Sequence, residues 1–244
     1  MNKTGIYLQS DFRDYYDEEL HDPTATKVFK RLSKSGMPRS EMLKYMNDVG
    51  LNTVPHGFVK NLYEKYYKSK NEKKNNPESM LGLVVYVDES AHRGEGKELL
   101  HYEEALEKYP NHYASVYMNN LNLTKSSFRH LQIGKKSYLL RYSSKDKWRS
   151  NFGNNISIYL RKVNDDKQYF FEKIRYPLFA LDFVLIKDIS YFMDFNISPQ
   201  CPDVIKYFDI TKIDEIGKKC YFKDCLTAKD AAKSLKEAIN YFDF

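Results

Sequence analysis

The sequence has few cysteines and no long apolar run. Its three cysteines, Cys201, Cys220 and Cys225, form neither a disulfide pattern nor the Cys/His set of a zinc site. No stretch is long and apolar enough for a membrane helix, and residues 1–20 are too acidic and polar for a signal peptide. We therefore expect a reduced, cytoplasmic protein with no membrane partner.

A strong excess of one charge is also lacking. The chain has 39 Lys and Arg against 33 Asp and Glu, a net charge of +6 in 244 residues. This balance suits anionic partners such as nucleotides, acidic peptides or nucleic acid, but only the short segment 70–74 is a compact basic stretch. Aromatic residues are abundant instead, with 21 Tyr and 15 Phe supplying much of the apolar content. The length is sufficient for one or two domains with a sizeable core.

Several segments have patterns typical of regular structure. Residues 36–50 predict a helix, because Pro38 stands in the first turn, apolar residues recur every three or four positions, and Gly50 follows the last of them. Residues 128–142 predict a hairpin that turns at Gly134. A strand is expected over 155–163 and helices over 168–175 and 227–242.

The most informative stretch is 179–196. Residues 179–186 and 191–196 are apolar and rich in β-branched and aromatic side chains, and the four residues between them are turn-like. This pattern predicts a β-hairpin.

Polar side chains interrupt both strands of this hairpin. Asp194 and Asn196 share a face, because side chains alternate along a strand. A loop at 188–190 would place Asp182 opposite Asn196, and a loop at 187–189 would place it opposite Asp194. Two bare carboxylates repel, and a hard cation removes that cost; two carboxylates and an amide oxygen suit Mg²⁺ when phosphates complete its shell. Alternatively, Asp182 caps a turn and Asp194 faces solvent on an edge strand.

A polar loop with two glycines lies upstream. Residues 81–87 predict a strand, 88–97 (DESAHRGEGK) a loop, and 102–108 a helix. Backbone N–H groups in such a loop can surround phosphates, although a solvated flexible turn has the same composition. The loop combines two glycines for close approach with two cations: Arg93, Gly94, Gly96 and Lys97.

The hairpin resembles the metal-binding end of ATP-grasp ligases, and most closely the branch that adds glutamate to ribosomal protein tails. That family carries an Asp on one strand and Glu-x-Asn, a small residue and Pro on the next; here these positions are Asp182 and 194–199 (DFNISP). Residues 129–135 resemble the family's strand with an Arg before an apolar run and a Gly turn. Residues 147–153 resemble its Phe-Arg-Ser-Asn segment. Order and approximate spacing agree from about residue 80 to residue 240.

The resemblance implies an α+β, ATP-grasp-like fold, in which two small α+β subdomains with antiparallel sheets enclose a nucleotide site. Residues 1–36 would form an N-terminal strand–helix segment, 37–120 the small subdomain with the Gly-rich loop, and 121–244 the C-terminal subdomain with the metal hairpin. The implied activity is ATP- and Mg²⁺-dependent ligation of a carboxylate to an amine or related nucleophile through an acyl phosphate. A peptide or a protein could supply either substrate.

The resemblance also assigns roles to individual residues. The metal ligands would be Asp182, Asp194 and Asn196. The contacts to ATP would come from Arg93, Gly94, Gly96, Lys97, Met118 and Arg129. The catalytic residues would be Arg141, Arg149 and Asn151: Arg149 and Asn151 would orient the acyl phosphate or carboxylate, and Arg141 would meet phosphates.

Three departures from the family pattern keep other functions open. Tyr86 stands near the family's Lys on the strand before the Gly-rich loop, and Arg39 stands near a second Lys at the start of a helix. Asp194 is shorter than the family's Glu. An inactive ATP-grasp-like protein that binds a nucleotide or a partner is therefore one alternative. A nucleic-acid-binding protein that uses Lys and Arg with exposed Tyr and Phe is another.

Overall fold

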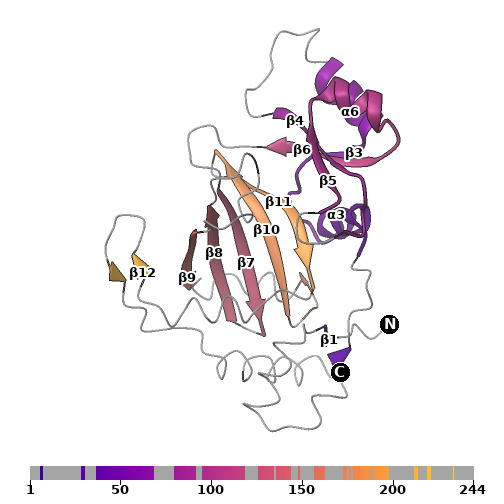
Figure 1. The fold of residues 1–244 in the computed structure, drawn as a ribbon. Helices are drawn as coiled ribbons and strands as arrows, with labels where there is room; N and C mark the ends of the chain where they lie inside the picture. Colours follow the sequence, from indigo (N-terminus) through magenta and orange to yellow (C-terminus); the bar gives the residue numbers. More distant parts are fainter. Residues whose placement is uncertain are drawn as a thin grey trace.

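The structure, a computed structural model, describes about half of the chain (Figure 1). The described residues are 6–7, 29–30, 37–68, 80–91, 95–118, 126–134, 136–143, 148, 157–162, 173–174, 176, 178–187, 189–197, 212–213, 219–220 and 233. The helices expected over 168–175 and 227–242 lie almost entirely outside these residues.

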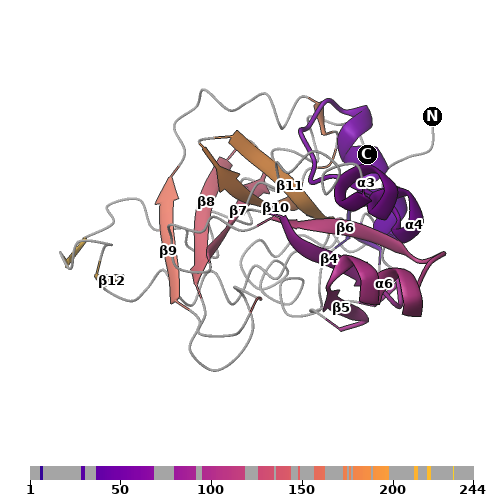
Figure 2. The same ribbon diagram turned by 90° about the horizontal axis from the view of Figure 1, so that it is seen from above.

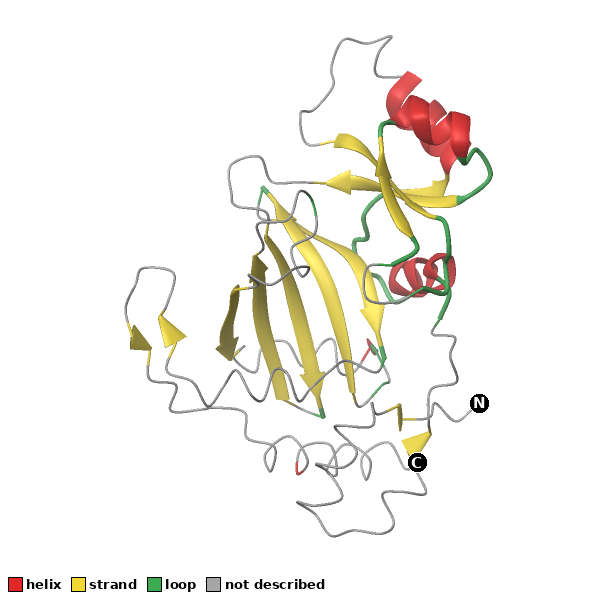
Figure 3. Ribbon diagram, in the orientation of Figure 1, coloured by secondary structure: helices red, strands yellow, loops and turns green. Residues whose placement is uncertain are grey.

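A four-stranded antiparallel sheet forms one part of the fold, which we call the small sheet. In spatial order its strands are β3 (His56–Phe58), β6 (Tyr113–Met118), β4 (Met80–Tyr86) and β5 (Lys97–Leu100). Helix α4 (Val59–Leu62), which continues as the π-helical segment η1 (Tyr63–Lys68), and helix α6 (Tyr102–Lys108) lie beside it (Figure 3).

Alternation along the strands gives the small sheet two different faces. Leu83 and Val85 of β4 and Ala114 and Val116 of β6 are buried in one core with residues of α4 and α6. The alternate positions, which include Tyr86, Lys97 and Ser115, belong to the opposite face. Tyr86 and Ser115 on this face are also buried, each at 4% exposure.

A five-stranded antiparallel sheet, the large sheet, forms the second part (Figures 1 and 2). In spatial order its strands are β11 (Ile189–Asn196), β10 (Leu178–Ile186), β7 (Ser126–Ile133), β8 (Lys136–Ser143) and β9 (Ser157–Lys162). Gly134, with φ of 57°, occupies the tight turn between β7 and β8, where a left-handed backbone favours glycine. The predicted α+β class and the predicted antiparallel sheets are confirmed in the described part of the chain.

Helix α3 (Arg39–Asp48) packs along the edge strand β11. It begins directly after Pro38 and ends before Gly50, whose φ is 81°, as the sequence predicts. Its buried side chains include Met42, whose Sδ accepts the backbone N–H of Phe195 at 3.0 Å. The ring of Tyr45 stacks on that of Phe195 with centroids 5.1 Å apart. The helix therefore satisfies one donor of the exposed sheet edge and covers the adjoining apolar side chains.

The segment 51–55 joins the two sheets. Its backbone exchanges hydrogen bonds with Phe192 of β11, through Asn52 O at 2.9 Å and Val54 N at 2.8 Å. Pro55 O accepts the N–H of Val116 of β6 at 2.8 Å. Because one short segment bonds to both sheets, it positions α3 and the small sheet against β11.

Short pairs of strands complete the described structure. Strand β1 (Ile6–Tyr7) runs parallel to β2 (Phe29–Lys30), and β12 (Lys212–Ile213) is antiparallel to β13 (Lys219–Cys220). None of the helices in the described part of the chain combines the length and the apolar composition needed to cross a membrane.

Candidate functional site

Asp182 and Asp194 lie directly opposite each other on β10 and β11. The turn of this hairpin has two residues, since Ile186 pairs with Ile189, so neither of the alternative three-residue loops is present. The pairing of Asp182 with Asp194, which the loop at 187–189 predicted, is nevertheless confirmed. A regular ladder from this turn would place Met193 opposite Asp182. A β-bulge between Asp182 and Phe183 shifts the register by one residue, leaves Met193 without a partner, and brings Asp194 into position.

Asn196 pairs with Ala180, two steps further along the ladder. Asn196 is two residues from Asp194, and Ala180 is two residues from Asp182, so the two carboxylates and the amide belong to one face. The predicted shared face of these three polar residues is therefore present.

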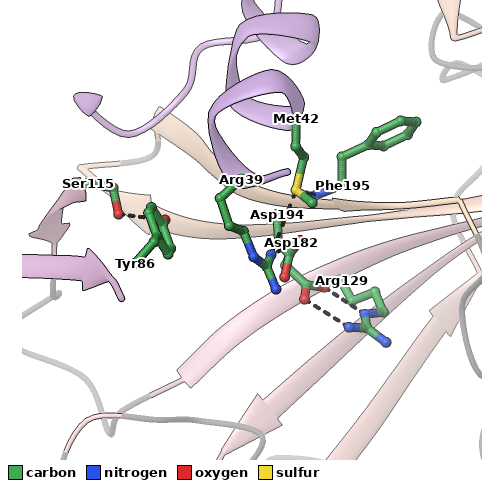
Figure 4. Close-up of polar contacts among 8 residues, drawn as sticks. All are labelled: Arg39, Met42, Tyr86, Ser115, Arg129, Asp182, Asp194 and Phe195. Carbon is green, nitrogen blue, oxygen red and sulfur yellow. Dashed lines mark hydrogen bonds and ion pairs between the residues drawn. The ribbon is translucent and has the colours of Figure 1, made fainter. Parts of the chain in front are cut away.

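Arg129 neutralises Asp182 within the large sheet. The two residues pair across β7 and β10, and the guanidinium donates two hydrogen bonds, from Nε to Oδ1 at 2.6 Å and from Nη2 to Oδ2 at 2.8 Å (Figure 4). The side chains are 16% and 12% exposed. Two parallel bonds from a planar group make this a geometrically fixed pair.

Arg39 neutralises Asp194 from outside the sheet. Arg39 is the first residue of α3, is 4% exposed, and its Nη1 lies 2.5 Å from Asp194 Oδ1 (Figure 4). Burial alone would raise the pKa of Asp194, but Arg39, followed by Lys97, lowers it well below its ordinary value. Burial likewise disfavours the charge on Arg39, and Asp194 outweighs this and raises the pKa of the guanidinium.

Lys97 reaches the same place from the small sheet. It is the first residue of β5 and pairs with Tyr86, the last residue of β4, and its Nζ lies 5.9 Å from the centroid of the Tyr86 ring. Burial, with Arg39 nearby, lowers the pKa of Lys97 to about 8, although Asp194 and Asp182 oppose the shift. Tyr86 stands near the position where the ATP-grasp pattern has a lysine, and Lys97, its cross-strand neighbour, supplies a cation there.

Tyr86 is buried beside this lysine. Its hydroxyl lies 2.9 Å from Ser115 Oγ on β6, and burial raises its pKa to about 12 despite that hydrogen bond (Figure 4). Tyr86 therefore stays neutral and presents a ring, and not a charge, at this position.

Together these side chains form a group that we call the charged cluster. Its members are Arg39, Lys97, Arg129, Asp182 and Asp194. It lies where the start of α3, the end of the small sheet and the β10–β11 hairpin meet.

The start of the Gly-rich loop contacts α3, and the base of the loop is tightly closed. The Glu89 carboxylate accepts hydrogen bonds from the backbone N–H of Ser40 at 2.9 Å and from its hydroxyl at 2.5 Å, so it caps the first turn of α3 next to Arg39. Gly96 has φ of 63°, and a Cβ there would lie 2.6 Å from Ala91 Cβ and 2.9 Å from Asp88 O. Only glycine fits this position without a shift of its neighbours.

The helix predicted over 102–108 is present as α6, but, contrary to our expectation, the loop does not lead directly into it. Strand β5 lies between the loop and α6, so α6 begins at Tyr102, after the strand. The loop is therefore the connection of a β4–β5 hairpin, with Asp88 N–H bonded to Gly96 O at 3.2 Å across its base. Four residues, Lys97–Leu100, were too few to show a strand period in the sequence.

The remaining predicted site residues are placed only in part. Met118 ends β6 and is buried in the core at 8% exposure. The backbone of Arg141 lies in β8 opposite Phe128. Four predicted residues lie outside the described part of the chain: Arg93, Gly94, Arg149 and Asn151.

Trp148 is the described residue next to Arg149 in the sequence, and it contacts the small sheet. The indole of Trp148 meets the ring of Tyr117 of β6 edge-on, with centroids 6.4 Å apart. Tyr117 belongs to the same face of the small sheet as Ser115, the hydrogen-bond partner of Tyr86. Trp148 therefore lies against the face of the small sheet that carries Ser115 and Tyr86.

The donor set of the hairpin fits a hard cation in chemical type. Carboxylate and amide oxygens are ligands that Mg²⁺ accepts. In the described residues, however, no group of three His, Cys, Asp or Glu side chains could hold a metal, and each carboxylate already has an arginine partner. The repulsion between Asp182 and Asp194 therefore does not by itself require a metal, and phosphate oxygens would have to complete the shell.

The sequence patterns do not identify Arg39 and Glu89 as site residues. Arg39 stands near a lysine position of the ATP-grasp pattern, and the sequence feature that marks it is a cation directly after Pro38, where a helix starts. Glu89 lies 49 residues from Ser40, and no local pattern connects them.

Comparison with known proteins identifies the fold. No protein-family model and no curated protein sequence matches the chain. Among solved structures, the ATP-grasp ligase PsnB complexed with minimal precursor, Mg and ADP has a TM-score of 0.50 and 12% identity, over 80% of this chain and 56% of that chain. The macrocyclase MdnC bound with precursor peptide MdnA, from Microcystis aeruginosa MRC, has a TM-score of 0.49 and 11% identity, over 93% and 72%.

A further similar structure is the D-alanine–D-alanine ligase from Bacillus anthracis, with a TM-score of 0.45 and 11% identity, over 86% of this chain and 71% of that chain. The chain spans little more than half of PsnB, at 58% in another structure of that ligase. At such identities the likeness shows the fold alone. In its fold, therefore, this chain resembles the ATP-grasp ligases.

Proposed function

We propose that this chain binds Mg·ATP at the charged cluster and joins a carboxylate to an amine or related nucleophile. One observation carries the proposal: on an ATP-grasp-like fold, three cations from three different elements converge on two facing carboxylates. Such a cluster suits a polyanion that carries its own divalent metal. In this proposal residues 37–120 and 121–244 are the two subdomains on either side of the nucleotide.

The chain's cations would hold and orient phosphates. Lys97 has no described carboxylate within ion-pair distance, and Arg39 is bonded to a single carboxylate oxygen, so both have donors to offer. The backbone around Gly94 and Gly96 would cover the phosphates, and Met118 would lie beside the base. These roles remain predictions from the resemblance.

The metal would be held by Asp182, Asp194 and Asn196. When bound, Mg²⁺ would neutralise phosphate charge and favour phosphoryl transfer. The carboxylate substrate would take the γ-phosphoryl group and release ADP. The amine would then attack the acyl carbon, lose a proton and displace phosphate, while Arg141, Arg149 and Asn151 orient the acyl phosphate.

The two arginine pairs also favour a second candidate, a nucleotide-binding protein without ligase chemistry. Because Arg129 and Arg39 already neutralise both carboxylates, the cluster is stable without a metal and could serve binding alone.

Two measurements test the proposal. Isothermal titration with ATP, with and without Mg²⁺, should show binding that depends on the metal. ADP release should then rise when amino acids or short peptides are supplied together as carboxylate and amine substrates, and amide formation should be detectable by mass spectrometry. Binding without ADP release for any substrate would favour the second candidate. Absence of Mg·ATP binding would contradict both.

A further inference from the structure

The two arginine–carboxylate pairs of the charged cluster are built differently. Arg129 and Asp182 are register partners on neighbouring strands of one sheet and share two hydrogen bonds. Arg39 and Asp194 come from α3 and β11, and a single nitrogen–oxygen contact joins them. The first pair is fixed by the register of one sheet, whereas the second depends on the packing of α3 against β11.

Arg39 also has few hydrogen-bond acceptors around its guanidinium. Besides Asp194, its described partner is the thioether of Met42 at 3.7 Å, which is a weak acceptor. A guanidinium has five N–H donors, and Asp194 and Met42 use few of them. Among the described residues only the hydroxyl of Tyr102 is fully buried without a hydrogen-bond partner, so the other donors of Arg39 are accessible to a ligand. An anion beside α3 would satisfy them, and phosphate oxygens have the geometry that a guanidinium prefers.

The charge of the cluster opposes a free metal ion. Three cations and two carboxylates leave one positive charge in excess. A free divalent cation would add two more, at the position where Arg39 already contacts Asp194. A metal that arrives with a nucleotide is part of an anion, and its phosphates attract Arg39 and Lys97.

We infer that Arg39 is a positioning residue: its ion pair with Asp194 breaks only when a metal bound to a nucleotide takes the carboxylate as a ligand. Arg39 then exchanges the carboxylate of Asp194 for phosphate oxygens. Metal and nucleotide therefore enter this site as one complex, and free metal does not bind first. This inference rests on the proposed function, because it concerns the same cluster.

Free Mn²⁺, followed by electron paramagnetic resonance, and Mn·ATP, followed by isothermal titration, test the inference on the full chain. The parent should leave free Mn²⁺ unbound at concentrations at which Mn·ATP binds. Arg39→Met, which keeps an apolar stem of similar length, should bind free Mn²⁺ about tenfold more tightly than the parent and Mn·ATP about tenfold more weakly.

Lys97→Met is the matched control, because it removes the same charge from the cluster without freeing an oxygen of Asp194. Its gain in free Mn²⁺ affinity should be less than about threefold by the electrostatic effect alone. Equal gains in Arg39→Met and Lys97→Met would overturn the inference, as would tight binding of free Mn²⁺ by the parent. If circular dichroism shows that Arg39→Met is unfolded, Arg39→Lys replaces it, with a gain of the same direction.

The outcomes separate the inference from the proposed function. If the parent does not bind Mn·ATP, the proposed function fails, whatever Arg39→Met does with free metal. If the parent binds Mn·ATP and Arg39→Met gains no affinity for free Mn²⁺, the function stands and the inference fails.

Discussion

Asp194 lies opposite Asp182 only because Met193 bulges out of the β11 ladder. In a regular ladder Asp194 would pair with Leu181, on the opposite face of the sheet. The bulge also explains why Phe192 and Phe195, three residues apart, both lie with the core face, against Phe183 and Phe179. One extra residue thus serves the core and the charged cluster together.

The first prediction concerns the two carboxylates. Asp182→Asn removes the charge that balances Arg129 and should lower the free energy of unfolding by about 2 kcal/mol. Asp194 has one contact with Arg39 and its side chain is 25% exposed, so Asp194→Asn should lower the free energy of unfolding by about 1 kcal/mol. Urea denaturation measures both changes. Under the proposed function, each variant also loses Mg²⁺-dependent ATP binding.

Asp48→Asn is the control for these carboxylates, since Asp48 is exposed at the end of α3. It should change the free energy of unfolding by less than about 0.5 kcal/mol and leave ATP binding intact. Full stability in Asp182→Asn would show that the bidentate pair contributes nothing. Mg·ATP binding at the parent's affinity in both site variants would remove the hairpin from the proposed function.

The second prediction uses the low pKa of Lys97. Its value is about 8 in the folded protein against 10.5 as the ordinary value. Between these values the unfolded chain holds the proton and the folded chain does not, so the contribution of Lys97 to stability rises as pH increases from about 8 to 10.5. Urea denaturation across this range should show a gain in the parent relative to Lys97→Met.

Nucleotide affinity should change in the opposite direction. Above pH 8 the parent loses the charge on Lys97 and should bind Mg·ATP more weakly, whereas Lys97→Arg keeps its charge and should show a flatter profile. Parallel profiles for the parent and Lys97→Arg would mean that Lys97 does not meet the nucleotide.

The third prediction concerns the base of the Gly-rich loop. Gly96→Ala combines a positive φ with a Cβ 2.6 Å from Ala91 Cβ and should lower the free energy of unfolding by about 2 kcal/mol or more. Gly50→Ala has a positive φ, but its nearest contact is the flexible Nζ of Lys173 at 3.3 Å, so about 1 kcal/mol is expected. Thermal and urea denaturation compare the two.

Only Gly96→Ala should also weaken ATP binding. Equal losses of stability and unchanged ATP affinity in both variants would reduce Gly96 to an ordinary turn residue.

The fourth prediction tests the cap that Glu89 provides to α3. Glu89→Gln removes a negative charge that accepts two hydrogen bonds at the helix N-terminus, and it should cost about 1 kcal/mol in urea denaturation. Glu41→Gln, at an exposed position in the same turn, should lower the free energy of unfolding by only about 0.3 kcal/mol. A smaller effect for Glu89→Gln than for Glu41→Gln would show that the cap does not anchor the loop.

Local patterns in the sequence determined much of the fold. The start and stop signals around α3 predicted its limits, because Pro and Gly act on the backbone of their own turn. The turn at Gly134 and the apolar runs of β10 and β11 predicted the two hairpins of the large sheet for the same reason. Alternation also placed Asp194 and Asn196 on one face.

Only the tertiary structure decided how the charged cluster is assembled. The partner of Asp182 is 53 residues away, and that of Asp194 comes from α3, so no local period links them. The bulge at Met193 brings Phe192 and Phe195 to one face of β11 and has no local signal in the sequence. The cation expected near Tyr86 comes from its cross-strand neighbour, Lys97. Sequence determines periodicity and turns because these are local, whereas charge pairing across elements depends on which surfaces the packed sheets bring together.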